Sequence, residues 1–120
     1  MKKGPRKLET SKTIAGLEKR YRKTRKPIWL DIAERLKKSR RKRASVNLWR
    51  LERLAQRFSG KTLVVPGKVL GTGEIKEKAT IIALEYSLSA KKKIGETGNA
   101  ITLAEAVKKE LKPENMVIVK

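Results

Sequence analysis

Hydrophobic residues recur every three or four positions in the first part of the chain, which predicts two amphipathic helices. The first spans residues 11–26 and ends before Pro27. Pro27 fits the first position of the second helix, because a helix needs no backbone N–H there, and this helix runs to about residue 38. The expected buried stripes are Ile14, Leu17 and Tyr21 in the first helix and Ile28, Trp29, Ile32, Ala33 and Leu36 in the second.

The middle of the chain predicts a loop, a short strand and a third helix. Residues 39–45 have no apolar periodicity, so we expect a loop there, followed by a short strand at residues 46–48. Apolar residues then return at helical spacing until Gly60, which supplies a stop signal. The apolar positions of this helix are Leu51, Leu54, Ala55 and Phe58.

The second half of the chain predicts strands that alternate with short helices. A β-branched run at residues 62–65 is closed by a turn at Pro66-Gly67, and a short extended piece leads to a second turn at Gly71-Thr72-Gly73. Residues 79–84 are almost entirely apolar, which is typical of a strand buried on both faces. Residues 116–119 predict the last strand.

Capping residues mark two helices in this half. Ser87 can cap a helix that ends near Gly98, and Thr102 with Glu105 forms a capping box that opens a helix running to Leu111. The expected core stripe of that last helix is Leu103, Ala106 and Val107. Strands alternating with helices behind a helical first part predict an α/β fold with irregular connections.

The length of 120 residues allows one domain with one modest core. Gly4 and Pro5 oppose regular structure, so we expect residues 1–10 to be a basic tail that orders on binding. Residues 11–120 then form a single domain, with a basic helical part at 11–61 and an α/β part at 62–120.

Charge adds a class of partner to this picture. The chain carries 32 Lys and Arg against 12 Asp and Glu, a net charge of +20. Residues 1–61 hold 22 basic and 5 acidic residues, a net charge of +17, whereas residues 62–120 hold 10 and 7, a net charge of +3. Such an excess repels itself without a polyanion, so the first half is expected to bind phosphate or an anionic membrane surface.

Several classes of site need residues that the chain lacks. Without Cys and His there is no disulfide, thiolate metal site, histidine-based triad or ordinary transition-metal site. Glu74 and Glu77, like Glu105 and Glu110, are scattered among cations and are better explained as partners in surface ion pairs with those cations than as a metal site or an acid–base pair. No apolar segment follows the basic start, and no run reaches membrane-spanning length. We therefore expect a cytoplasmic, non-enzymatic protein without a cofactor, a membrane partner or a small-molecule substrate.

The densest basic segment is Arg40-Arg41-Lys42-Arg43. Adjacent guanidinium groups can bridge phosphates bidentately and neutralise several backbone charges at once. A localisation signal or a solvated loop is the alternative. The large overall charge favours RNA binding.

A second basic candidate lies on the third helix, where Arg50, Arg53 and Arg57 share one face away from the apolar stripe. These arginines could instead form a solvated face paired with Glu52 and other acids. One acid among three arginines is too few for that, so phosphate contact is favoured.

Two weaker candidates involve lysines beside glycines or a helix start. Gly67, Lys68 and Gly71 match neither a dinucleotide fingerprint nor a P-loop. Close approach of an RNA strand to these glycines, with Lys68 as a point charge, and plain β-turns are equally consistent. Lys91-Lys92-Lys93 follow the helix start at Ser87, where either phosphate binding or ordinary capping with solvated lysines fits.

The aromatic residues are too scattered to form a platform that reads single strands. Trp29 and Phe58 are expected in the core. Trp49 has polar and basic neighbours, so it either stacks on a base or covers a helix end.

Three motifs, VNLWRLERLA (46–55), VVPGKVLGTG (64–73) and SLSAKKKIGETG (87–98), resemble in their order and spacing the archaeal and eukaryotic large-subunit ribosomal protein eighteen-e family. Bacterial large-subunit protein fifteen is the sister of this family. The similarity covers about residues 11–120. Relatives usually have a small residue where this chain has Trp49, and the chain lacks the long basic C-terminal tail of the eukaryotic members, which favours an archaeal source.

The resemblance implies an α/β fold in which N-terminal helices and a basic tail precede an irregular succession of β-β-α units. It also implies a structural constituent of the large ribosomal subunit that binds large-subunit ribosomal RNA and neighbouring ribosomal proteins, without catalysis or a cofactor. We expect a monomer away from the ribosome. The residues expected to contact RNA are Lys2, Lys3, Arg6, Lys7, Lys12, Arg20, Arg22, Lys23, Arg25, Arg40, Arg41, Lys42, Arg43, Asn47, Arg50, Arg53, Arg57, Gly67, Lys68, Gly71, Lys91, Lys92 and Lys93.

Two other functions use some of the same features. A small nucleoid-type DNA-binding protein needs the same charge but would favour duplex DNA. An RNA-modifying enzyme associated with the ribosome would need a cofactor fingerprint or clustered acids, which the sequence lacks.

Overall fold

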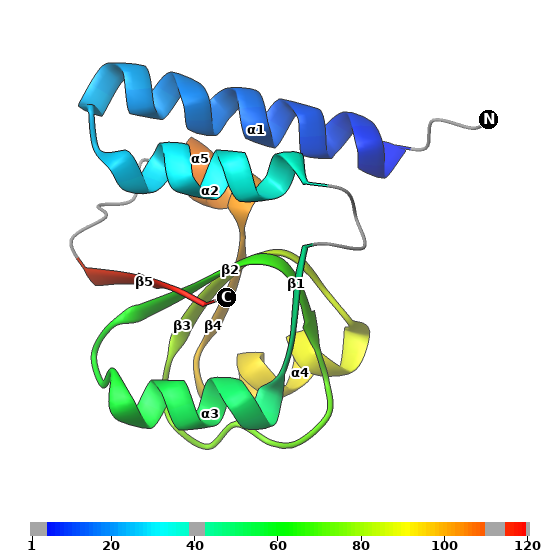
Figure 1. Cartoon of the computed structure of the whole chain (residues 1–120). Coiled ribbons are helices and arrows are strands. Elements are labelled where there is room, and N and C mark those ends of the chain that lie inside the picture. Colours follow the sequence, from blue (N-terminus) through cyan, green and yellow to red (C-terminus); the bar gives the residue numbers. More distant parts are fainter. Residues whose placement is uncertain (1–4, 39–42, 110–114, 120) are drawn as a thin grey trace.

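Figure 1 shows a computed structural model of the chain, which describes residues 5–38, 43–109 and 115–119. Two helices precede a mixed series of strands and helices, so the α/β class is confirmed. The elements are α1 (Pro5–Thr24), α2 (Pro27–Lys37), β1 (Ala44–Asn47), α3 (Leu48–Arg57), β2 (Thr62–Leu70), β3 (Thr80–Tyr86), α4 (Leu88–Thr97), β4 (Asn99–Thr102), α5 (Leu103–Lys108) and β5 (Met116–Ile118).

A parallel five-stranded sheet forms the centre of the domain, in the order β1-β2-β3-β4 with β5 also paired to β2. One edge of β2 pairs with β3, and its other edge is shared by two strands. Residues 62–64 pair with β5, and residues 67–70 pair with β1. The parallel strands β2 and β3 are joined through residues 71–79 without a helix, which is an irregular connection of the expected kind.

Helices cover both faces of the sheet (Figure 1). One apolar cluster lies between the sheet and α3 with α4, and a second lies between the sheet and α1, α2 and α5. Ile81 and Ala83 of β3 belong to the first cluster and Ile82 belongs to the second. The prediction that this strand is buried on both faces is therefore confirmed.

Several boundaries differ from those expected. Helix α1 begins at Pro5, so the expected start at residue 11 was wrong, and residues 5–10 are helical rather than part of a tail. Proline suits the first turn of a helix, as Pro27 does at the start of α2. The strand β1 begins at Ala44, inside the expected loop, and α3 begins at Leu48. Helix α5 ends at Lys108 with Lys109 as its C-terminal cap, so the expected continuation of this helix to Leu111 was wrong.

The capping predictions are confirmed. The hydroxyl of Ser87 accepts a hydrogen bond from the backbone N–H of Ala90, 3.2 Å away, at the start of α4. Thr102 and Glu105 form the capping box of α5, in which each side chain accepts a hydrogen bond from the backbone N–H of the other residue.

The two aromatic residues expected in the core differ in burial. Trp29 is buried as expected, whereas Phe58 is only half-buried and lies outside both apolar clusters.

The expected turn at Pro66-Gly67 was wrong, because β2 runs through both residues. The pairing of β2 with β3 shifts between Val65 and Lys68, and this irregularity accommodates a proline that lacks a ladder N–H. Gly67 is paired with Ala44 of β1, and a Cβ on Gly67 would overlap the Ala44 carbonyl oxygen. The glycine therefore permits the close pairing of β1 with β2.

We predict that Gly67→Ala lowers the free energy of unfolding by about 1–3 kcal/mol, because β1 must move to admit the methyl group. Urea denaturation measures the change. Gly95→Ala is the matched control, because a Cβ at Gly95 of α4 meets no atom within 4 Å. Alanine there should raise stability by up to about 1 kcal/mol, since glycine is a poor helix former. Equal losses in the two variants would contradict the proposed role of Gly67.

Candidate nucleic-acid interface

Helix α3 separates its apolar and basic residues on opposite sides. It starts directly after β1, because Asn47 is both the last residue of β1 and the residue before the first helical turn. Leu48, Leu51 and Ala55 are buried against the sheet. Arg50, Arg53 and Arg57 are exposed and, at about 100° per residue, lie within about 60° of one another around the helix axis. We call these three residues the α3 arginine face, and its predicted orientation away from the core is confirmed.

The acid nearest in sequence does not pair with these arginines. A carboxylate oxygen of Glu52 accepts hydrogen bonds from the backbone N–H groups of Lys76 and Glu77, both at 3.0 Å. The other oxygen lies 3.4 Å from the side-chain nitrogen of Gln56. Among the residues that the structure describes, no ion pair joins Glu52 to an arginine. Glu52 therefore does not compensate the positive charge of the α3 arginine face.

Two of these guanidinium groups lie over aromatic rings. The Cζ atom of Arg53 is 5.7 Å from the ring centroid of Trp49, and that of Arg57 is 5.5 Å from the ring centroid of Phe58. Cation–π contacts of this kind restrain the arginines without neutralising them. From the sequence, Trp49 was considered as a stacking residue but was not included among the predicted binding residues. Its position four residues before Arg53, which places the two side chains on one side of a helix, could have indicated the contact.

The connection at residues 71–79 packs between α3 and α4. The backbone N–H of Trp49 donates to the carbonyl oxygen of Thr72 at 3.2 Å, and the ammonium of Lys93 donates to the carbonyl oxygens of Gly71 and Gly73, both at 2.9 Å. Gly73 has a φ of 94°, which favours glycine. Lys93 thus ties α4 to this connection, a structural role that its sequence neighbours did not indicate.

The glycines expected to approach RNA have contacts within the protein instead. Gly67 lies inside the sheet, and a Cβ on Gly71 would overlap the hydroxyl oxygen of Ser89. Lys68 is half-buried in β2, between Ser45 of β1 and Glu85 of β3. Protein packing explains these glycines, and an RNA contact at these positions stays a prediction.

Helix α4 presents the remaining lysines of its basic run to solvent. Lys91 and Lys92 are exposed, whereas Lys93 is half-buried. The first turn is capped by Ser87, as the simpler of the two sequence interpretations expected. Of the three lysines in this run, Lys91 and Lys92 are therefore available to a partner, whereas Lys93 has a role within the protein.

Helix α1 carries a second basic surface in the helical layer on the other side of the sheet (Figure 1). Among the α1 side chains that the structure describes, the exposed cations are Lys12, Lys19, Arg22 and Lys23, which we call the α1 basic face. Lys19 was not among the predicted binding residues, although it lies seven positions after Lys12 and thus on the same side of a helix. The structure brings these four residues onto one helix but not next to the α3 arginine face.

Other predicted binding residues have structural contacts or undescribed side chains. The guanidinium of Arg20 lies 5.3 Å from the ring centroid of Trp29, and the Nε of Arg43 donates to the carbonyl oxygen of Leu36 at 3.1 Å, near the end of α2. Arg25 has a φ of 60° and follows the end of α1. The side-chain oxygen of Asn47 is buried and has no hydrogen-bond partner among the described residues. Lys2, Lys3, Arg40, Arg41 and Lys42 lie outside the described residues, and the side chains of Arg6 and Lys7 are not described.

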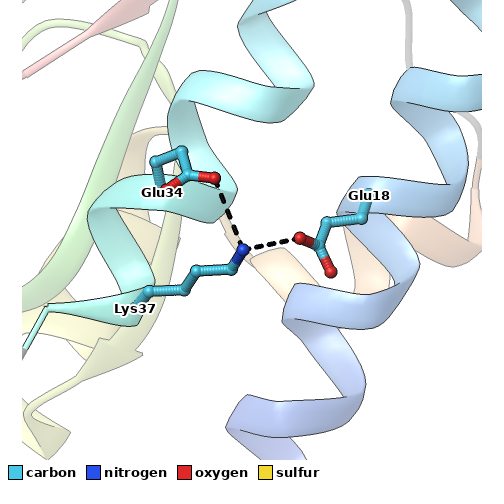
Figure 2. Close-up of polar contacts among 3 residues, drawn as sticks. All are labelled: Glu18, Glu34 and Lys37. Carbon is cyan, nitrogen blue, oxygen red and sulfur yellow. Dashed lines mark hydrogen bonds and ion pairs between the residues drawn. The ribbon is translucent and has the colours of Figure 1, made fainter.

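Some acids of the N-terminal half join helix to helix rather than neutralise its surface. Figure 2 shows the ammonium of Lys37 in α2 between Glu18 of α1, at 2.7 Å, and Glu34 of α2, at 3.4 Å. The hydrogen bond with Glu18, followed by that with Glu34, raises the pKa of Lys37 above its ordinary value. The three side chains are accessible to solvent, so the contact adds little stability, and α1 packs on α2 mainly through the apolar cluster that includes Leu17 and Ile32.

The described residues contain no cluster of three or more acidic, His or Cys side chains that could hold a metal ion. None of the helices in the described ranges combines the length and apolar character needed to cross a membrane.

We predict that Lys93→Met lowers the free energy of unfolding by about 1–2 kcal/mol, because the carbonyls of Gly71 and Gly73 lose a charged donor. Lys92→Met removes the same charge from an exposed position of α4 and should change stability by less than about 0.5 kcal/mol. Urea denaturation of both variants measures the difference. Equal stability of the two variants would show that Lys93 is a surface cation and not a structural tie.

Comparison with known proteins identifies relatives of the whole domain. A family model that describes the ribosomal proteins 50S-L15 and 50S-L18e, together with a related protein of the 60S subunit, matches residues 31–102. Large ribosomal subunit protein eL18 of Haloarcula marismortui is 44% identical over 97 residues, which are 81% of this chain and 82% of that protein. The protein of the same name from Methanopyrus kandleri is 39% identical over 119 residues, 96% of this chain and 92% of that protein. These matches confirm the resemblance carried by the three sequence motifs, and the chain belongs to the family of the ribosomal proteins 50S-L15 and 50S-L18e.

Proposed function

We propose that this chain is a structural constituent of the large ribosomal subunit that binds and stabilises the RNA of that subunit through contacts of Lys and Arg with phosphate. The observation that carries the proposal is the α3 arginine face, which presents three exposed guanidinium groups. The neighbouring carboxylate, Glu52, accepts hydrogen bonds from backbone N–H groups and does not pair with these arginines. The names of the relatives support the same assignment, because each is a large ribosomal subunit protein.

Electrostatics explains why such a face favours RNA. Like charges on adjacent turns of one helix destabilise it unless counter-charges are present. Guanidinium groups bind phosphate oxygens through paired hydrogen bonds, and the counterions that the RNA releases add to the free energy of binding. Binding thus offsets a repulsion that the protein's own acids leave in place.

Two basic surfaces on opposite sides of the sheet support a role in holding RNA segments together. The α1 basic face and the α3 arginine face belong to different helical layers, separated by at least on the order of 20 Å of packed protein. Separate RNA segments can occupy the two surfaces, with the α/β core as a rigid spacer. We place this protein in the cytoplasm, on the ribosome next to other large-subunit proteins, and as a monomer away from it.

We predict that binding to a large-subunit RNA fragment weakens steeply with salt, and that Arg50→Gln/Arg53→Gln/Arg57→Gln reduces the magnitude of the log–log salt slope by roughly 2–3. Filter binding at a series of salt concentrations measures the slope. The matched control is Lys78→Gln/Lys108→Gln/Lys109→Gln, which removes the same charge from exposed positions outside both basic faces.

The control variant should keep most of the affinity and most of the slope of the unsubstituted protein. A slope near zero for the unsubstituted protein would overturn the phosphate-contact mechanism. Duplex DNA serves as competitor in the same assay, and a preference for duplex DNA over the RNA fragment would favour the nucleoid-type alternative.

A further inference from the structure

Trp49 is a large apolar side chain that the fold leaves exposed. Its exposed fraction is 49%, and among the described residues only Leu88 of α4 is another exposed large hydrophobic, at 91%. The second tryptophan, Trp29, is 1% exposed in the cluster on the other side of the sheet. An exposed indole ring has much apolar area to bury when a partner binds.

The position of Trp49 is held by three neighbouring contacts. Its backbone N–H donates to the carbonyl oxygen of Thr72, and its Cβ lies so close to Gly73 that a Cβ on that glycine would be 2.8 Å away. The guanidinium of Arg53 lies over the ring. A ring placed in advance loses little conformational entropy on binding.

The ring lies within the α3 arginine face. At about 100° per residue, Trp49, Arg50, Arg53 and Arg57 fall within an arc of about 100°, on the side of α3 opposite its buried residues. An apolar protein surface would have to desolvate these cations, whereas a nucleotide offers a flat ring and a phosphate together. The charge around the ring therefore selects RNA as the occupant. Since paired bases hide their faces inside the duplex, the occupant must be unpaired.

We propose that Trp49 stacks on an unpaired nucleobase of the bound RNA, while Arg50 and Arg57 contact the phosphates that flank this base. Arg53 stays over the indole and holds it in place. The inference rests on the proposed function and deepens it, because it adds a preference for a bulge or loop to a surface that would otherwise bind any RNA backbone.

Two RNA hairpins test the proposal, one with a single unpaired adenosine in its stem and one with a fully paired stem, and in both a non-nucleotide linker replaces the loop so that no other base is unpaired. Trp49→Ala should weaken binding to the bulged hairpin by about tenfold and change binding to the paired hairpin little. Its log–log salt slope should stay unchanged, because no phosphate contact is removed. Leu88→Ala is the control, since it removes an exposed apolar side chain outside the arginine face and should affect neither hairpin.

Tryptophan fluorescence gives a direct readout of stacking. Emission of the unsubstituted protein should fall when the bulged hairpin is added and much less with the paired hairpin. Trp49→Phe keeps Trp29 as the sole indole, and its emission should not change with either RNA. This second variant keeps an aromatic ring at the position and should retain most of the affinity for the bulged hairpin, so its comparison with Trp49→Ala separates loss of stacking from loss of fold.

The outcomes distinguish the two proposals. If the unsubstituted protein binds neither hairpin, the proposed function fails. If it binds both with a steep salt dependence, but Trp49→Ala changes neither affinity and the emission stays constant, only the stacking inference is overturned. That result would leave a neighbouring protein as the partner of the exposed ring.

Discussion

The parallel pairing of β1 with the second half of β2 determines where the arginines of α3 lie. The pairing depends on Gly67, whose missing side chain leaves room for the carbonyl of Ala44. Since α3 begins at the residue after the end of β1, there is no flexible linker between them, and the strand fixes the rotation of the helix about its own axis. Glu52 then binds the connection between β2 and β3, which Lys93 holds from α4. A close contact between two strands thereby sets the orientation of a charged surface.

Several acidic side chains of this protein make contacts within the protein, whereas many basic side chains lie on its surface. Glu18 of α1 and Glu34 of α2 both contact Lys37, Asp31 forms an ion pair with Arg35 within α2 at 2.8 Å, and Glu52 accepts hydrogen bonds from backbone N–H groups. Within the described residues, Glu52 therefore leaves the α3 arginine face without a carboxylate partner. The resulting repulsion costs stability in the isolated protein and adds to the gain when phosphate binds. The α1 basic face and the α3 arginine face lie on opposite sides of one core, which agrees with the proposed role in holding RNA segments together.

Local signals predicted the elements whose causes are local. The apolar stripe of α2, the side of α3 that carries the arginines, the serine cap of α4 and the capping box of α5 follow from periodicity and capping chemistry within single elements. The start of α1 was missed because Pro5 was interpreted as a helix breaker, although a first helical turn accepts proline. Turn chemistry was misleading at Pro66-Gly67, because the same residues form an irregular strand when a neighbouring strand pairs with them.

The sequence by itself determined the class of fold, the family and the two basic helices, because these depend on composition, periodicity and the order of motifs. Only the tertiary structure decided which cations stay on the surface. Lys93 and Lys92 are neighbours in one lysine run, yet one binds two carbonyls and the other is exposed. Likewise, Glu52 lies among three arginines in sequence but contacts residues 76 and 77 in space. Such contacts arise between distant segments, so no local pattern of residues encodes them.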